Sequence, residues 1–258
     1  MNKRLWTREE EIVVFNLYCK IPFNKSSKFH PEVIKIAELI KRTPSAVNMK
    51  IGNFGRFDEE LKKRNISGLS NGSKLDEEIW NEFNEKWDDL VYESEMILSA
   101  LKQGKILDKN KRILGQEIER TVKQRINQDF FRSSVLASYE GSCCVTGLAT
   151  DALLVASHIK PWKVCSCEEK TNPQNGLCLN ALHDKAFDRG YMTVDMNYRI
   201  HISDEIKDIF YGDTVEKYFK CYDGQSIILP EKFLPKKTFL EYHNDIIFES
   251  WKRNSLYV

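Results

Sequence analysis

The sequence predicts an α+β protein with a helical N-terminal module and a second part that contains short strands. Apolar residues recur at helical spacing through the first part of the chain. From residue 143, short apolar runs bounded by turn residues replace this pattern. The 258 residues are enough for two modest domains, and 41% hydrophobic with 30% charged residues argues against wholesale disorder.

Composition also indicates the cellular location of the protein and the state of its cysteines. No apolar run approaches the length of a membrane span, and the start MNKRLWTREEE lacks the apolar core of a secretory signal. We therefore expect a cytoplasmic location, where the seven cysteines would be free thiols or metal ligands. The net charge of +1 neither supports nor excludes nucleic-acid binding, because basic and acidic stretches alternate.

Residues 1–72 are expected to form the helical module. Thr7 and Glu10 have the spacing of a capping box, and the apolar periodic run that follows them ends at Pro22. Pro31 suits the first turn of a second helix, PEVIKIAELIKR.

The segment RTPSAVNMKIGNFGRFD resembles a helix-turn-helix. One helix ends near Arg42, and a new helix is predicted to begin at Ser45 after a tight turn. Such a second helix can enter the major groove of DNA. The alternative is a small helical bundle that does not bind DNA. The polar positions that would suit base edges and phosphates are Ser45, Asn48, Lys50, Asn53 and Arg56.

Residues 73–124 are expected to be a helical linker or bridging segment. The stretch ISGLSNGSKLD at its start is rich in Gly, Ser and Asn, which is typical of a linker. The helix predicted after it, DEEIWNEFNEKWDDLVYESEMIL, is too acidic to lie on DNA. It would bridge the domains or pack against another copy of the chain. Its apolar face comprises Ile79, Phe83, Trp87, Leu90 and Val91.

Residues 125–258 contain four short motifs in a fixed order. CVTG (144–147) predicts a turn after a short strand, and ASHIKPW (156–162) ends a buried strand. NGLCL (175–179) predicts a second strand, and HDKAFDRG (183–190) a helix closed by Gly190. YMTVD and YRIHIS follow as a predicted hairpin, and a final helix completes the chain.

This order of strand, loop, strand and helix, with these four motifs, resembles the ββα-metal core of HNH endonucleases. The match is closest to the branch found in bacterial restriction-type proteins, and it covers about half of the chain. The resemblance implies a nuclease that hydrolyses DNA phosphodiester bonds in restriction or defence, with double-stranded DNA as its partner. Cutting both strands needs two active sites or two encounters, which favours a homodimer.

The resemblance and the chemistry of hydrolysis together suggest roles for particular residues. His158 would be the general base, because a neutral imidazole can take a proton from water near pH 7. Asn175 would orient that imidazole and pin the two strands together. Asp184 and Asp188, four residues apart on one helix, would hold one divalent cation, Mg²⁺ or else Mn²⁺. His183 would be a secondary metal or phosphate ligand.

Other positions near these motifs have less specific roles. Ser157 replaces the metal-binding aspartate of many HNH enzymes, although the branch resembled here also has small residues there. Structural zinc is not favoured, because CC and CSC lack the spacing of CxxC pairs. The residues expected to contact phosphates are Lys160, Lys163 and Arg189.

Two alternatives to a DNA nuclease use the same residues. A non-catalytic DNA-binding regulator on an HNH scaffold would bind DNA tightly without cutting it, and Ser157 would mark its lost metal site. A nuclease for RNA or structured nucleic acid would keep the site and differ only in substrate.

Overall fold

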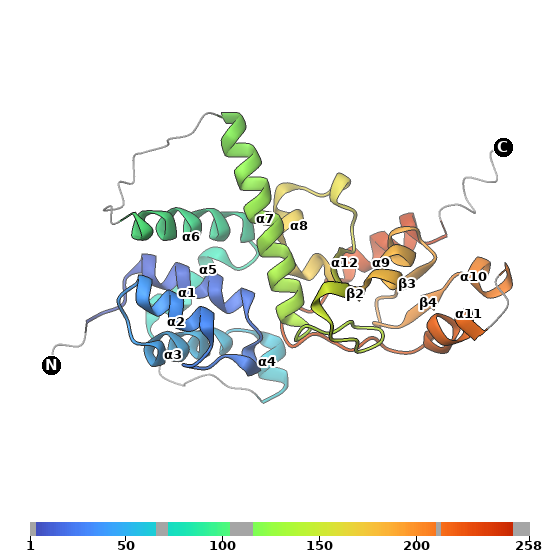
Figure 1. Cartoon of the computed structure of the whole chain (residues 1–258), viewed down its shortest axis with the longest axis horizontal. Helices are drawn as coiled ribbons and strands as arrows, with labels where there is room; N and C mark the ends of the chain where they lie inside the picture. Colours follow the sequence, from blue (N-terminus) through green and yellow to red (C-terminus); the bar gives the residue numbers. More distant parts are fainter. Residues whose placement is uncertain (1–3, 66–71, 104–115, 210–212, 250–258) are drawn as a thin grey trace. The chain divides into compact units, whose positions relative to one another are not determined.

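The computed structural model describes residues 4–65, 72–103, 116–209 and 213–249 (Figure 1). These residues fall into two compact units. The helical unit comprises residues 1–138 and 167–172, and the second unit comprises residues 139–166 and 173–258. Much of the predicted linker, at 66–71, and residues 104–115 of the predicted bridging segment lie outside the described residues. No helix in the described ranges has both the length and the apolar character needed to cross a membrane.

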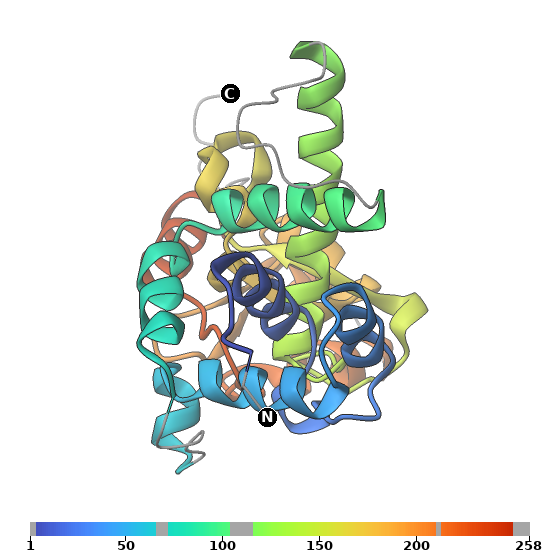
Figure 2. The ribbon, with the colours of Figure 1, turned by 90° about the vertical axis from the view of Figure 1, so that its left-hand side faces the viewer.

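The helical unit is built around α1 (Arg8–Lys20), which packs against most of the other helices of this unit (Figure 2). The predicted capping box is confirmed, since Thr7 and Glu10 each accept a hydrogen bond from the other's backbone N–H. The other helices of this unit are α2 (Pro31–Leu39), α3 (Pro44–Gly55), α4 (Glu59–Lys63), α5 (Lys74–Phe83), α6 (Trp87–Lys102), α7 (Gln116–Ser138) and α8 (Cys167–Thr171).

Aromatic side chains from several helices form the core of the helical unit. The ring of Phe15 on α1 lies 4.8 Å from that of Phe54 and 5.2 Å from that of Trp80, centroid to centroid. Trp87 is fully buried beside them. Because Trp80 and Trp87 come from α5 and α6, the helices of the predicted bridging segment pack into the core of this unit rather than spanning between two bodies.

The long helix predicted after residue 75 is two helices. Its apolar face is buried as expected, but the chain turns between α5 and α6. Glu85 adopts a left-handed backbone conformation there, with φ of +73°. This break lets α5 and α6 each place an apolar side against α1.

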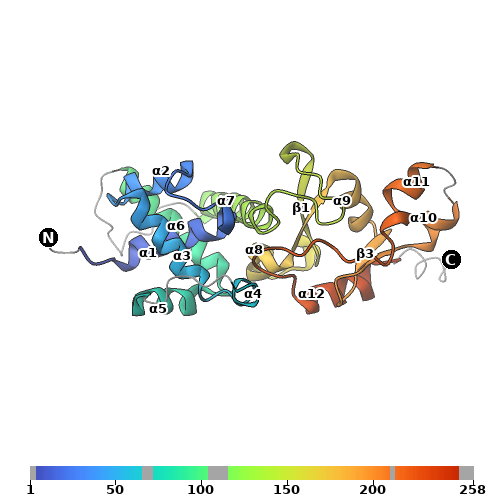
Figure 3. The ribbon, with the colours of Figure 1, turned by 90° about the horizontal axis from the view of Figure 1, so that it is seen from below.

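The second unit has the predicted strand, loop, strand and helix order, so the α+β fold class is confirmed. Strand β1 (Leu154–His158) pairs antiparallel with β2 (Gly176–Asn180), and His158 lies opposite Gly176. Helix α9 (Ala181–Asp188) follows directly and contacts both strands (Figure 3). The predicted hairpin is formed by β3 (Met192–Val194) and β4 (Ile200–Ile202).

Shorter elements complete this unit and correct two details of the prediction. Residues 143–147 form a turn rather than a strand and turn, and the predicted loop after β1 contains α8. The remaining helices are α10 (Asp204–Ile209), α11 (Asp213–Tyr218), α12 (Lys237–Tyr242) and the π-helix His243–Ile247. Single 3₁₀ turns of this unit lie at Asp151–Leu153, Trp162–Val164, Pro173–Asn175 and Lys220–Tyr222, and the helical unit has one at Phe23–Lys25.

Candidate active site

A pocket of about 510 Å³ lies where β1 ends, and α9 forms one of its walls. His158 is half-exposed at its edge. The imidazole meets Trp162 edge to face, with ring centroids 5.4 Å apart and an interplanar angle of 83°. Trp162 lies half-exposed in the pocket wall, so it limits the orientations that the imidazole can adopt.

Asn175 fixes the turn that leaves β1 directly after His158. Its side-chain oxygen accepts a hydrogen bond from the Lys160 backbone N–H at 2.8 Å, and its amide nitrogen donates to the Lys160 carbonyl at 3.3 Å. The Asn175 carbonyl also accepts from the Ile159 N–H at 2.9 Å. These contacts bracket the peptide groups that follow His158. The buried Asn175 therefore holds the backbone directly after His158 in place.

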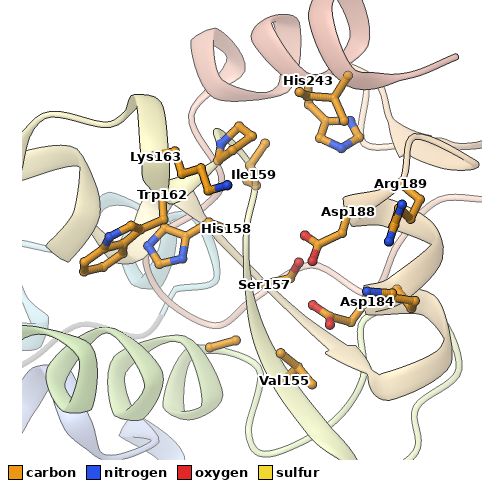
Figure 4. Close-up of a pocket in the computed structure, with 14 residues that line it drawn as sticks. Val155, Ser157, His158, Ile159, Trp162, Lys163, Asp184, Asp188, Arg189 and His243 are labelled. Atoms are coloured by element: carbon orange, nitrogen blue, oxygen red, sulfur yellow. The ribbon is translucent and has the colours of Figure 1, made fainter. Parts of the chain in front are cut away.

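Asp184 and Asp188 point from α9 toward Ser157 on β1 (Figure 4). Loss of hydration raises the pKa of Asp184, and the neighbouring Ser157 hydroxyl opposes this effect. Loss of hydration also raises the pKa of Asp188, and the negative charge of Asp184 raises it further. Each carboxylate is thus destabilised in its charged form, and a cation bound between them would relieve this.

The same residues fit a hydrated divalent cation. Across the described part of the chain, no group of three or more His, Cys, Asp or Glu side chains is arranged to hold a metal ion. Mg²⁺ keeps several of its waters and is commonly bound by one or two carboxylates. Asp184 and Asp188, with the Ser157 hydroxyl beside them, form a donor set of that kind.

The comparison with known families agrees with this geometry. Residues 143–195 match the family model described as HNH endonuclease. The second unit contains an HNH endonuclease domain. The matched residues run from the turn before β1 through β3, and they include His158, Asn175, Asp184 and Asp188. No curated protein matches the chain.

Basic side chains surround the carboxylates of the HNH domain. Lys163 and Arg189, two of the three predicted phosphate contacts, are exposed in the pocket wall. The Lys160 ammonium, the third, lies 5.6 Å from the centre of the Tyr242 ring. Lys185 also lines the pocket and was missed by the sequence prediction. Its position four residues before Arg189 on α9 was the available signal.

His183 was predicted as a secondary metal or phosphate ligand, and the structure places it elsewhere. It is 1% exposed. One ring nitrogen lies 3.1 Å from the Asn180 amide nitrogen, and the other lies 2.7 Å from the Tyr218 carbonyl oxygen. Neighbours on a helix point about 100° apart, so His183 faces the protein interior while Asp184 faces the pocket. The prediction for His183 was wrong.

The cysteines near the motifs are mostly buried. Cys144 and Cys178 are both fully buried. The Cys144 N–H donates to the Cys178 carbonyl at 2.7 Å. This bond attaches the CVTG turn to β2.

Two of the five DNA contacts predicted on and just after α3 face the core of the helical unit. The Lys50 ammonium is paired with Glu11 and Asp76, and the Asn53 amide donates to Asp76 at 3.0 Å. Both side chains are buried, so Lys50 and Asn53 were wrongly predicted to contact DNA. Among the other three predicted contacts, Ser45 is exposed, whereas Asn48 and Arg56 are half-buried.

His243 on the π-helix lines the pocket and packs against Phe187 of α9. The ring stacks on Phe187 at 3.7 Å. One ring nitrogen donates to the Phe187 carbonyl at 3.1 Å, and in the neutral ring the other accepts from the Thr193 hydroxyl at 2.8 Å. Burial favours this neutral form and lowers the pKa of His243 from 6.5 to about 4. The imidazole thus packs within the unit, with both ring nitrogens in hydrogen bonds.

The depressed pKa of His243 predicts a loss of stability in acid. The unfolded chain takes up this proton below about pH 6.5 and the folded chain only near pH 4, so the stabilisation is present above pH 6.5 and is lost as the pH falls. Between pH 7 and pH 5 the free energy of unfolding should fall by about 2 kcal/mol from this residue. Urea unfolding of wild type and His243→Gln at both pH values measures it. Equal pH dependence in the two proteins would contradict the assignment.

Proposed function

We propose that the protein is a metal-dependent HNH endonuclease that hydrolyses phosphodiester bonds of double-stranded DNA. The observation that supports this most directly is one pocket that contains His158, Asp184 and Asp188 together with exposed basic side chains. In Figure 4 the imidazole stands on one side of β1 and the two carboxylates on the other. A phosphodiester would therefore lie across the end of this strand.

The residues of the pocket would have different roles in hydrolysis. Asp184 and Asp188 would hold the divalent cation, Mg²⁺ or Mn²⁺, which when bound polarises the phosphate and stabilises the leaving oxygen. A ring nitrogen of His158 would accept the proton of the attacking water. Lys163 and Arg189 would neutralise phosphates on either side of the cut.

The motifs ASHIKPW, NGLCL and HDKAFDRG support a role in bacterial restriction or defence, and the proposed location is the cytoplasm. Cutting both strands of DNA would be achieved by a homodimer with one active site in each protomer. In the helical unit, the proposed DNA contacts that remain are Ser45, Asn48 and Arg56.

Plasmid cleavage tests this function. Supercoiled DNA, with and without base modification, is incubated with the protein in Mg²⁺, Mn²⁺ or EDTA. The expected result is nicking and linearisation that require the metal, and a dependence on modification would support restriction. DNA that is shifted in a gel but never cut would favour the non-catalytic regulator. Cleavage of structured RNA but not of DNA would make RNA the substrate, with the same proposed active-site residues.

Asp184→Asn should weaken the metal site. The change keeps the size of the side chain but removes one of the two charges that would hold the cation. We expect the Mg²⁺ concentration for half-maximal cleavage to rise at least about 10-fold. Asp213→Asn is the control, because Asp213 is an exposed carboxylate of the same unit, paired with Lys217 on α11. If Asp184→Asn needs the same Mg²⁺ concentration as the wild type, Asp184 does not bind the cation.

A further inference from the structure

A second pocket adjoins the proposed catalytic pocket and shares part of its wall. It has a volume of about 330 Å³ and is lined mostly by apolar and aromatic side chains. Its rim holds the charged residues Lys185, Arg189 and Glu205. The apolar and aromatic lining comprises Leu182, Ala186, Tyr191, Ile206, Val215 and Phe219.

Helix α9 separates the two pockets, because residues four apart on a helix share a face. Asp184 and Asp188 line only the catalytic pocket. Lys185 and Arg189 line both pockets and are exposed between them. Leu182 and Ala186, on a third side of α9, line only the apolar pocket. A strand that places a phosphate in the catalytic pocket and crosses the exposed basic pair would thus reach the apolar pocket.

The wall of the apolar pocket is held in place by buried contacts. The ring of Phe219 packs edge to face against His183, with centroids 5.6 Å apart. His183 is itself fixed by its contact with the Tyr218 carbonyl oxygen. The mouth is open, since Leu182 is 47% exposed. The pocket is therefore preformed, and a preformed pocket favours tight binding of a flat apolar ligand.

We infer that this pocket binds one unstacked nucleobase of the strand whose phosphates contact Lys185 and Arg189. The inference rests on the proposed function. Bases stack on aromatic side chains through their apolar faces whatever their identity, and Tyr191 and Phe219 supply such rings. The basic pair at the rim matches the charge of the flanking phosphates. Extruding a base costs least when it is already unpaired, so the pocket should favour DNA that carries an unpaired nucleotide.

Binding to three duplexes tests this inference without any cleavage. One duplex carries a single unpaired base, the second carries an abasic residue at that place, and the third is fully paired. Affinities are measured in EDTA by fluorescence anisotropy. The wild type should bind the unpaired base about 10-fold more tightly than the abasic residue. Leu182→Trp, which narrows the mouth, should bind these two duplexes equally.

Leu153→Trp is the matched control, since Leu153 is a 50% exposed leucine of the same unit that lies outside the pocket. It should keep the preference of the wild type. Equal wild-type affinity for the unpaired base and the abasic residue would overturn the inference, as would no binding to any duplex. If the protein cleaves plasmid DNA but binds the unpaired-base and abasic duplexes with equal affinity, the base-binding inference is wrong and the proposed function stands. If the protein prefers the unpaired-base duplex but does not cleave plasmid DNA, the proposed function is wrong and the base-binding inference stands.

Discussion

His158→Ala should reduce DNA cleavage about 10²- to 10⁴-fold, the usual contribution of a general base. The imidazole lies at the end of β1 beside Trp162, and the turn after it is fixed by Asn175. Alanine removes the proton acceptor and leaves this turn and both carboxylates in place. Binding of DNA should therefore remain close to that of the wild type while cleavage is lost. Single-turnover cleavage and gel-shift binding, measured side by side, separate the two effects.

The matched control is His201→Ala. His201 is half-exposed in the same unit and pairs with Asp195 at 2.9 Å, outside the pocket. Its removal should leave cleavage within about 2-fold of wild type, because surface substitutions away from special features usually change little. If His158→Ala cuts DNA as fast as His201→Ala, another group is the base.

Lys50→Met should lower the free energy of unfolding of the helical unit by about 3–5 kcal/mol, the usual cost of removing one partner of a buried ion pair. The ammonium lies 2.8 Å from a Glu11 oxygen and also pairs with Asp76. All three side chains are at most 4% exposed. Methionine keeps the length of the side chain but leaves two buried carboxylates without their cation. Urea unfolding followed by the tryptophans measures the loss.

Lys35→Met is the comparison, since Lys35 is an exposed lysine of the same unit, paired with Glu32. It should cost at most about 1 kcal/mol, as surface pairs do. Burial raises the pKa of Glu11 to about 7 even with Lys50 present. Lys50→Met should raise the pKa of Glu11 further, so the variant should regain part of its stability in acid. Equal losses in the two variants would show that the buried pair does not stabilise the fold.

The proposed catalytic elements were predictable because each has a local signal. Thr7 and Glu10 cap α1 through residues three apart, and β1, β2 and α9 follow from short motifs whose spacing sets their order. Asp184 and Asp188 reach one pocket because they are a helical turn apart. In each case the deciding contacts join residues that are close in the sequence.

The errors arose where the deciding partner is distant in the sequence. Lys50 and Asn53 have the polarity of DNA-contacting residues, but their partner Asp76 lies on a different helix. His183 is held by the carbonyl of Tyr218, 35 residues later. Helical spacing placed Lys50 and Asn53 on one side of α3, yet nothing local showed that this side faces inward.

The assignment of residues 167–172 to the helical unit affects how the protein can be divided. The chain passes from one unit to the other after residues 138, 166 and 172. The segment that joins β1 to Asn175 thus includes α8, which packs on α6 and α7. A fragment that begins at residue 139 would contain α8 without these neighbours. The HNH domain therefore cannot be excised at one peptide bond, because the chain passes between the two units three times.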